Sequence, residues 1–148
     1  AVRTAEGKPA VYKSLNGGKT WSKAGAPTDP DWSVSNISGL AVHPTKPNTL
    51  YAATWFPGVY KSVNGGATWS RLMNAPNGGS CVVFNPSDPE DIFVGYDNGV
   101  FHSADGGATW SDLSAGLTFK SVAWIEIDGP ARLLYAAVRG NGIWRRSF

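Results

Sequence analysis

The sequence has one cysteine, few charged residues and no long apolar run. The lone cysteine, Cys81, allows no disulfide bond within the chain, and its apolar neighbours Val-Val-Phe indicate a buried strand residue rather than a nucleophile. Charged residues make up 16% of the 148 residues, the net charge is +2, and no run of Lys or Arg occurs, so we expect no nucleic-acid partner. No segment is long and apolar enough to cross a membrane as a helix, so we expect no membrane partner.

Helical periodicity is also lacking, whereas glycine and tryptophan are abundant. The chain holds 18 Gly and 7 Trp, a composition typical of turn-rich β-proteins. Many of these residues belong to one nine-residue pattern that occurs three times, as Lys13–Trp21 (KSLNGGKTW), Lys61–Trp69 (KSVNGGATW) and His102–Trp110 (HSADGGATW). Three copies of one pattern indicate an internal repeat, and the repeat determines the architecture.

The repeating unit is longer than the nine-residue pattern. Tyr51, Phe93 and Tyr135 follow one another at a spacing of about 42 residues, and each lies in a similar apolar segment. Each unit contains an apolar strand, a Pro-rich turn, a second and a third strand, and then the nine-residue pattern leading to a fourth strand. Near-continuous apolar first strands indicate burial on both faces. We therefore predict an all-β fold, a β-propeller whose blades have four antiparallel strands.

Each part of the nine-residue pattern has a structural role in a hairpin loop. Two adjacent glycines adopt positive φ angles easily, the Asn or Asp oxygen accepts hydrogen bonds from loop amides, and the Ser hydroxyl joins the same network. The Trp is expected to bury its ring between neighbouring sheets. A metal site is not expected, because two of the three copies carry a neutral Asn. These structural residues are Ser14, Asn16, Trp21, Ser62, Asn64, Trp69, Ser103, Asp105 and Trp110.

The pattern Ser-x-Asp/Asn-x-Gly-x-Thr-Trp resembles the Asp-box, or BNR repeat. The longer segment from Ile37 to Ser70 is most similar to the propellers of glycoside hydrolase family 74, the xyloglucan-cleaving endoglucanases. Sialidases, sortilin-like receptors and photosystem II assembly factors share the box but differ around it. The resemblance implies a secreted, extracellular protein that acts on or binds a polysaccharide without a cofactor, with its boxes away from the ligand face.

The number of blades is too small for a closed ring. At about 42 residues per unit, the chain holds about three and a half blades. We expect one partial propeller over residues 1–148, whose missing blades come from another chain or a longer one, or from a second copy of itself. The expected boundaries are a partial blade at 1–23, blades at 37–72 and 80–113, and a partial blade at 119–148.

Ligand-binding residues are expected in the loops at the end of the blades opposite the boxes, because loops on a rigid scaffold carry most binding residues. Aromatic rings there can stack on sugar rings, and polar side chains can bind sugar hydroxyls. The alternative is that the aromatic residues only cap the blades. The expected substrate-binding residues are Trp32, Trp55, Phe56, Tyr96, Arg139 and Asn141.

Glycoside hydrolysis requires two carboxyl groups roughly 5–10 Å apart. Asp29, Asp31 and Asp97 are the candidates in the expected ligand loops, and no sequence context favours one of them. The related enzymes place a catalytic Asp directly after Arg-Thr, but here Arg3-Thr4 is followed by Ala5, so Glu6 receives no catalytic role. Whether the chain is an enzyme stays open. The alternatives are a non-catalytic scaffold for protein interaction or assembly, and an excised or designed half-propeller.

The two histidines do not form a metal site by themselves. Asn85 occupies the position of His43 in the next unit, and both residues begin a Pro-rich turn. Because an amide and an imidazole share the ability to accept a hydrogen bond, we expect a role in the turn rather than in metal binding.

Overall fold

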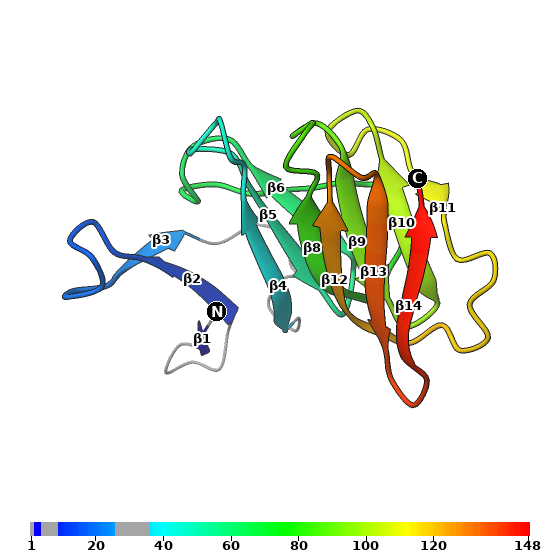
Figure 1. Cartoon of the computed structure of the whole chain (residues 1–148). Helices are drawn as coiled ribbons and strands as arrows, with labels where there is room; N and C mark the ends of the chain where they lie inside the picture. The colour runs from blue at the N-terminus through cyan, green and yellow to red at the C-terminus, as the bar shows by residue number, and fades with distance from the viewer. Residues whose placement is uncertain (1, 4–8, 26–35) are drawn as a thin grey trace.

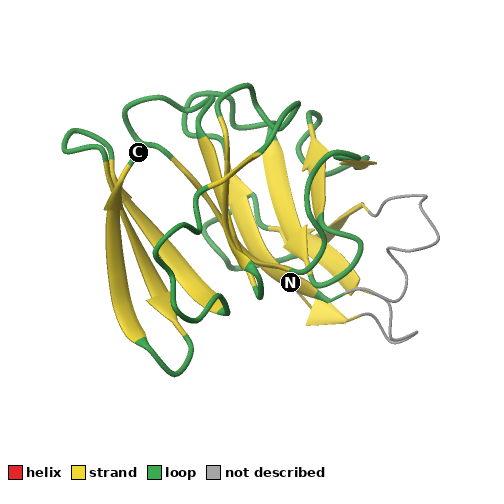
Figure 2. Cartoon of the chain, turned by 90° about the vertical axis from the view of Figure 1, so that its right-hand side faces the viewer, coloured by secondary structure: helices red, strands yellow, loops and turns green. Residues whose placement is uncertain are grey.

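The computed structural model describes residues 2–3, 9–25 and 36–148 (Figure 1). In these residues the secondary structure consists of strands joined by turns, as Figure 2 shows. The all-β prediction is confirmed. The strands are β1 (Val2–Arg3), β2 (Pro9–Lys13), β3 (Ser22–Gly25), β4 (Ile37–Val42), β5 (Leu50–Thr54), β6 (Val59–Ser62), β7 (Ser70–Arg71), β8 (Gly79–Phe84), β9 (Ile92–Tyr96), β10 (Gly99–Ser103), β11 (Ser111–Asp112), β12 (Val122–Asp128), β13 (Leu133–Val138) and β14 (Gly142–Ser147).

The strands form four antiparallel sheets, each made from consecutive strands. The first sheet has the order β1-β2-β3, the second β4-β5-β6-β7, the third β8-β9-β10-β11 and the fourth β12-β13-β14. Two sheets of four strands flanked by two of three strands make a partial propeller of about three and a half blades, as predicted. The exact blade boundaries stay a prediction.

Three apolar clusters hold neighbouring sheets together. One cluster joins the first sheet to the second, the next joins the second to the third, and the last joins the third to the fourth. The second strands of the two complete sheets, β5 and β9, are buried along their whole length. Each sheet therefore buries its faces against its neighbours rather than within a core of its own.

The first strands differ from the prediction of burial on both faces. In β4, Leu40 and Val42 are 42% and 52% exposed, whereas Val82 in β8 is 5% exposed. The two positions are equivalent, because Leu40 pairs with Ala52 in β5 and Val82 pairs with Val94 in β9. Leu40 and Val42 line a cavity between the first and second sheets, so the first sheet leaves both side chains partly exposed.

Close approach between first strands depends on small residues and on serine. A Cβ atom added at Gly39 would lie 2.8 Å from the Cα atom of Cys81, so only glycine fits there. The Ser80 hydroxyl lies 2.9 Å from the Gly95 carbonyl of its own sheet and 2.5 Å from the Val122 carbonyl of the next sheet. Ser38 makes the same pair of contacts, to the carbonyls of Ala53 and Gly79. The serines therefore tie each first strand to the next.

The turns after the first strands are built as the sequence indicated. Nδ1 of His43 accepts hydrogen bonds from the backbone N–H groups of Thr45 and Lys46, at 3.2 and 3.1 Å. In the next unit, the side-chain oxygen of Asn85 accepts a hydrogen bond of 2.9 Å from the N–H of Ser87. Both residues serve their turn, and both are buried.

Candidate functional site

The three Asp-box hairpins share one internal hydrogen-bond network. In each, the Ser hydroxyl donates to the Asn or Asp oxygen and accepts from the second glycine N–H, while the Asn or Asp oxygen accepts from the Thr N–H. The Trp indole N–H donates to the carbonyl of the second glycine at 3.0 to 3.2 Å. The hairpin bonds engage the Ser, Asn or Asp, and Trp side chains of the motif within the hairpin, so these side chains have a structural role.

Asp105 is the one carboxylate among the three central residues of the boxes. The Thr109 hydroxyl donates to it at 2.6 Å, and the Thr109 and Ser103 groups add two more hydrogen bonds. These bonds lower the pKa of the Asp105 carboxyl to about 2, with Thr109 as the main cause. The carboxylate is therefore occupied by its own hairpin.

The expected ligand loops lie at the opposite end of the strands from the boxes. The boxes connect third to fourth strands, and the loops 54–58, 96–99 and 139–142 connect second to third strands. In an antiparallel sheet of consecutive strands, successive connections alternate between the two ends. We call the end with these loops the loop face.

Trp55 and Phe56 are two exposed aromatic residues of the loop face. They are 55% and 47% exposed, and they are neighbours in a short loop. The loop is held at its base, because the Thr54 hydroxyl donates to the Gly58 carbonyl at 2.8 Å and accepts from the Gly58 N–H at 3.2 Å. A Cβ atom at Gly58 would lie 2.6 Å from the Pro76 carbonyl oxygen, so the loop also packs closely on the neighbouring link. The two rings are presented by a fixed backbone.

Tyr96 does not belong to the loop face, which corrects the expectation from the sequence. It is the last residue of β9 and its side chain is fully buried, with the ring edge-on to Phe101 at a centroid distance of 5.3 Å. Its hydroxyl has no hydrogen-bond partner in the described part of the chain, and burial raises its pKa. Successive side chains of a strand point to opposite faces, and that of Tyr96 points toward the second sheet. A sugar ring cannot reach it there.

Asp97 and Arg139 lie together on the loop face and link the third and fourth sheets. The Asp97 carboxylate accepts a hydrogen bond of 2.8 Å from the Ser121 hydroxyl, and the same oxygen lies 3.7 Å from the Arg139 guanidinium. The backbone N–H of Arg139 also donates to the backbone carbonyl of Ser121 at 2.9 Å. The sequence analysis did not single out Ser121, although it carries a hydroxyl and ends the link between β11 and β12.

Of the remaining predicted site residues, one is described by the structure and three are not. Asn141 is exposed in the turn between β13 and β14, and its N–H donates to the Val138 carbonyl at 3.1 Å. Asp29, Asp31 and Trp32 lie outside the described residues. Because two of the three candidate carboxylates are among them, the catalytic assignments stay predictions.

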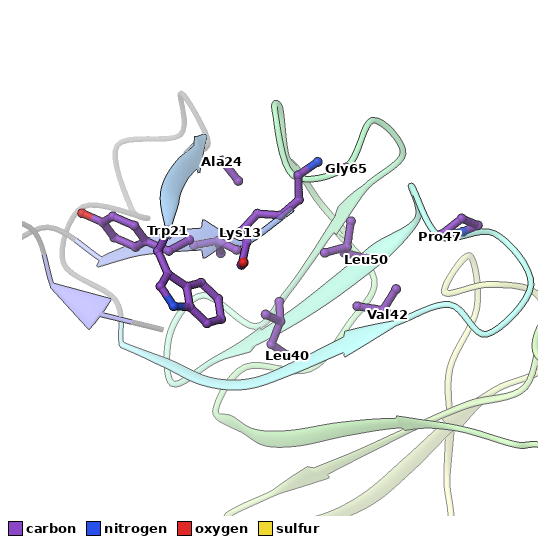
Figure 3. Close-up of a pocket in the computed structure, with 11 residues that line it drawn as sticks. Lys13, Trp21, Ala24, Leu40, Val42, Pro47, Leu50 and Gly65 are labelled. Atoms are coloured by element: carbon purple, nitrogen blue, oxygen red, sulfur yellow. The ribbon is translucent and has the colours of Figure 1, made fainter. Parts of the chain in front are cut away.

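An apolar cavity of about 260 Å³ lies between the first and second sheets (Figure 3). Trp21 and Lys13 come from the first sheet and its hairpin, while Leu40, Val42 and Leu50 come from the second. The cavity is bordered by the box residues Ser14, Trp21 and Gly65, so it does not lie on the loop face. Among the described residues it is a gap between two sheets and not part of the expected polysaccharide site.

The structure gives no sign of a metal site or a membrane-spanning helix in the part it describes. Within residues 2–3, 9–25 and 36–148, no three side chains of His, Cys, Asp or Glu gather as metal ligands would. The same residues include no helix with the length and hydropathy needed to cross a bilayer.

Comparison with known proteins assigns the fold. Residues 12–23 match the model of the BNR/Asp-box repeat. A family 74 glycoside hydrolase from Niastella koreensis is similar at a TM-score of 0.63 and 26% identity, over 74% of this chain and 20% of that one. The family 74 xyloglucanase from Xanthomonas campestris has a TM-score of 0.73 and 20% identity, over 93% of this chain and 25% of that one.

A protein of a different kind has the same architecture. YCF48, in a structure with a bound D1 peptide, is similar at a TM-score of 0.62 and 15% identity, over 88% of this chain and 42% of that one. No curated protein sequence matches significantly. The chain is thus a partial BNR-type β-propeller that resembles those of glycoside hydrolase family 74, and it spans a fifth to a quarter of the length of these two enzymes.

Proposed function

We propose that this chain is part of a secreted propeller directed at polysaccharide, with a β-glucan such as xyloglucan bound along the loop face. The observation that carries the proposal is the pair of exposed rings Trp55 and Phe56 on a loop with a fixed backbone. Aromatic rings offer flat apolar surfaces to the C–H faces of sugars, and rigid presentation lowers the entropic cost of binding. The likeness to family 74 enzymes supports the same ligand class.

The polar groups on the loop face suit the hydroxyl groups of a glycan. Arg139 is 58% exposed and Asp97 36% exposed, so the pair is accessible while Ser121 holds it in place. Charged groups of opposite sign in a fixed arrangement can accept and donate hydrogen bonds to one sugar residue. Trp55 and Phe56 would supply most of the affinity, and Asp97, Arg139 and Asn141 the orientation.

Affinity electrophoresis in gels containing xyloglucan tests the proposal. The unaltered chain should be retarded, and Trp55→Ala should weaken binding by about tenfold, because exposed aromatic anchors carry a large share of binding energy. Val63→Ala is the matched control, since Val63 is 68% exposed but belongs to an Asp-box hairpin at the other end. Equal retardation of the unaltered chain and Trp55→Ala would contradict the assignment of the loop face.

Hydrolysis needs a separate test. Asp97 is the one candidate catalytic carboxylate among the described residues. A reducing-sugar assay on xyloglucan with Asp97→Asn distinguishes cleavage from binding. Loss of activity with unchanged retardation would support a catalytic carboxylate, whereas full activity would remove Asp97 from the candidates.

The second candidate function is a scaffold for protein interaction or assembly. The likeness to YCF48 in a structure with a bound D1 peptide favours it, although that likeness concerns the fold. A chain that is retarded by no soluble β-glucan would support the scaffold.

A further inference from the structure

The outer face of the fourth sheet carries two hydrogen-bond donors that no residue of the described ranges engages. Tyr135 in β13 and Arg145 in β14 are directly paired across the sheet. Tyr135 is half-buried, Arg145 is exposed, and neither the hydroxyl nor the guanidinium has a partner among the described residues. Trp124 and Ile143 on the same sheet are 57% and 80% exposed. This face therefore combines exposed apolar surface with donors that no described residue engages, a combination typical of an interface.

The same two positions in the second sheet are already used to bind an Asp-box hairpin. Tyr51 and Lys61, two repeat units earlier in the sequence, are paired across the second sheet in the same way. The Tyr51 hydroxyl donates to the Gly106 carbonyl at 2.8 Å, and the Lys61 ammonium donates to the same oxygen at 3.2 Å. Gly106 is the first glycine of the third box. A tyrosine and a cation in this register thus hold the hairpin of the adjoining sheet.

The matching acceptor is exposed at the other end of the molecule. Gly17 is the first glycine of the first box, with φ of 67° against 66° at Gly106. Gly106 is buried, whereas Gly17 is exposed and a Cβ atom added to it would have no neighbour within 4 Å. Trp21 of the same hairpin is 63% exposed, whereas Trp69 is 6% exposed. The first hairpin has the shape of a docked box, and no sheet of the described part of the chain covers its Gly17.

We propose that the outer face of the fourth sheet binds the Ser14–Trp21 hairpin of a second copy of this chain. The Tyr135 hydroxyl and the Arg145 guanidinium donate to the Gly17 carbonyl of that copy, as Tyr51 and Lys61 donate to Gly106. The hairpin and the fourth sheet lie at opposite ends of one molecule (Figure 1), so one copy cannot make this contact with itself. Two copies that each use both ends form a closed head-to-tail pair.

Two variants each block one half of the contact at positions that are exposed in the single copy. Arg145→Glu reverses the charge of an exposed side chain. Gly17→Asn places a side chain between the hairpin and the sheet, and asparagine accepts a positive φ angle. The matched controls are Lys120→Glu, also at an exposed position, and Gly140→Asn, where φ is 75° and a Cβ atom again meets nothing within 4 Å.

Light scattering over a range of concentrations measures the mass. We expect two copies for the unaltered chain and for both controls. Arg145→Glu and Gly17→Asn should each raise the dissociation constant by about tenfold or more and shift the mass toward one copy, while circular dichroism stays unchanged. An equimolar mixture of the two variants should recover pairs, because a mixed pair keeps one of its two contacts intact.

Four results would overturn the proposal. The first is an unaltered chain that has the mass of one copy at all concentrations. The second is a two-copy mass that either variant leaves unchanged. The third is a mixture that stays at one copy, which would exclude the head-to-tail arrangement. A mass above two copies would also contradict it, because it indicates contacts that do not close.

Discussion

The first and second Asp-box hairpins have the same internal structure but different surroundings. In both, the Ser, Asn, Thr and Trp side chains make the same hydrogen bonds at nearly equal distances. Trp21 is 63% exposed and Trp69 is 6% exposed, because the second hairpin packs on β3 of the first sheet, whereas no sheet of the described residues packs on the first hairpin in this way. The hairpin therefore forms from its own sequence, and its contribution to stability depends on the neighbouring sheet.

Replacing the tryptophans should show the largest difference between the two hairpins. Trp69→Ala removes a buried ring from the cluster with Val11, Leu50 and Tyr60, and should lower the free energy of unfolding by about 3–5 kcal/mol. Trp21→Ala, in a ring that is already mostly in water, should lower it by less than about 1 kcal/mol. Urea unfolding at low protein concentration measures both, and equal losses would contradict the comparison.

The second glycines of the two boxes should differ by a smaller amount. Gly18 and Gly66 both have φ of 87°, so the backbone strain of an alanine should lower the free energy of unfolding by the same amount, about 1 kcal/mol, at either position. At Gly66 the added Cβ atom would also lie 3.2 Å from the Cβ atom of Ala24, whereas at Gly18 the nearest atom is 3.8 Å away. Gly66→Ala should therefore be more destabilising than Gly18→Ala in urea unfolding. The reverse order would show that contact with β3 is unimportant.

The third hairpin adds a dependence on pH that the other two lack. The pKa of Asp105 is lowered from 3.8 to about 2, so the unfolded state binds more protons than the folded state between these values. This contribution to stability is complete above about pH 4 and is lost as the pH falls toward 2. Asp105→Asn, which copies Asn16 and Asn64, should flatten the pH dependence of the melting temperature in this window. An unchanged pH profile would mean that Asp105 is not held by Thr109 in solution.

Much of the fold could be predicted from the sequence, because the same strands, turns and Asp-boxes recur in each repeat unit. The strand order and the turn role of His43 and Asn85 follow from local patterns. The burial expected for the box tryptophans is found for Trp69 but is wrong for Trp21, because it depends on a neighbouring sheet. Tyr96 could not be placed in the same way, since it ends a strand and the sequence does not show which side of the sheet its last residue faces. The pairing of Asp97 with Ser121 and Arg139 joins residues of two sheets, so no single unit reveals it.

The sequence by itself determined the hairpins, because their hydrogen bonds and positive φ angles involve residues at most four positions apart. It also determined the four-stranded unit, since each strand pairs with the next one along the chain. Only the tertiary structure decided which faces are covered. Burial of Trp69 and exposure of Trp21, Leu40, Trp124 and Ile143 depend on whether another sheet lies alongside, and that is a property of the assembled sheets rather than of any one segment.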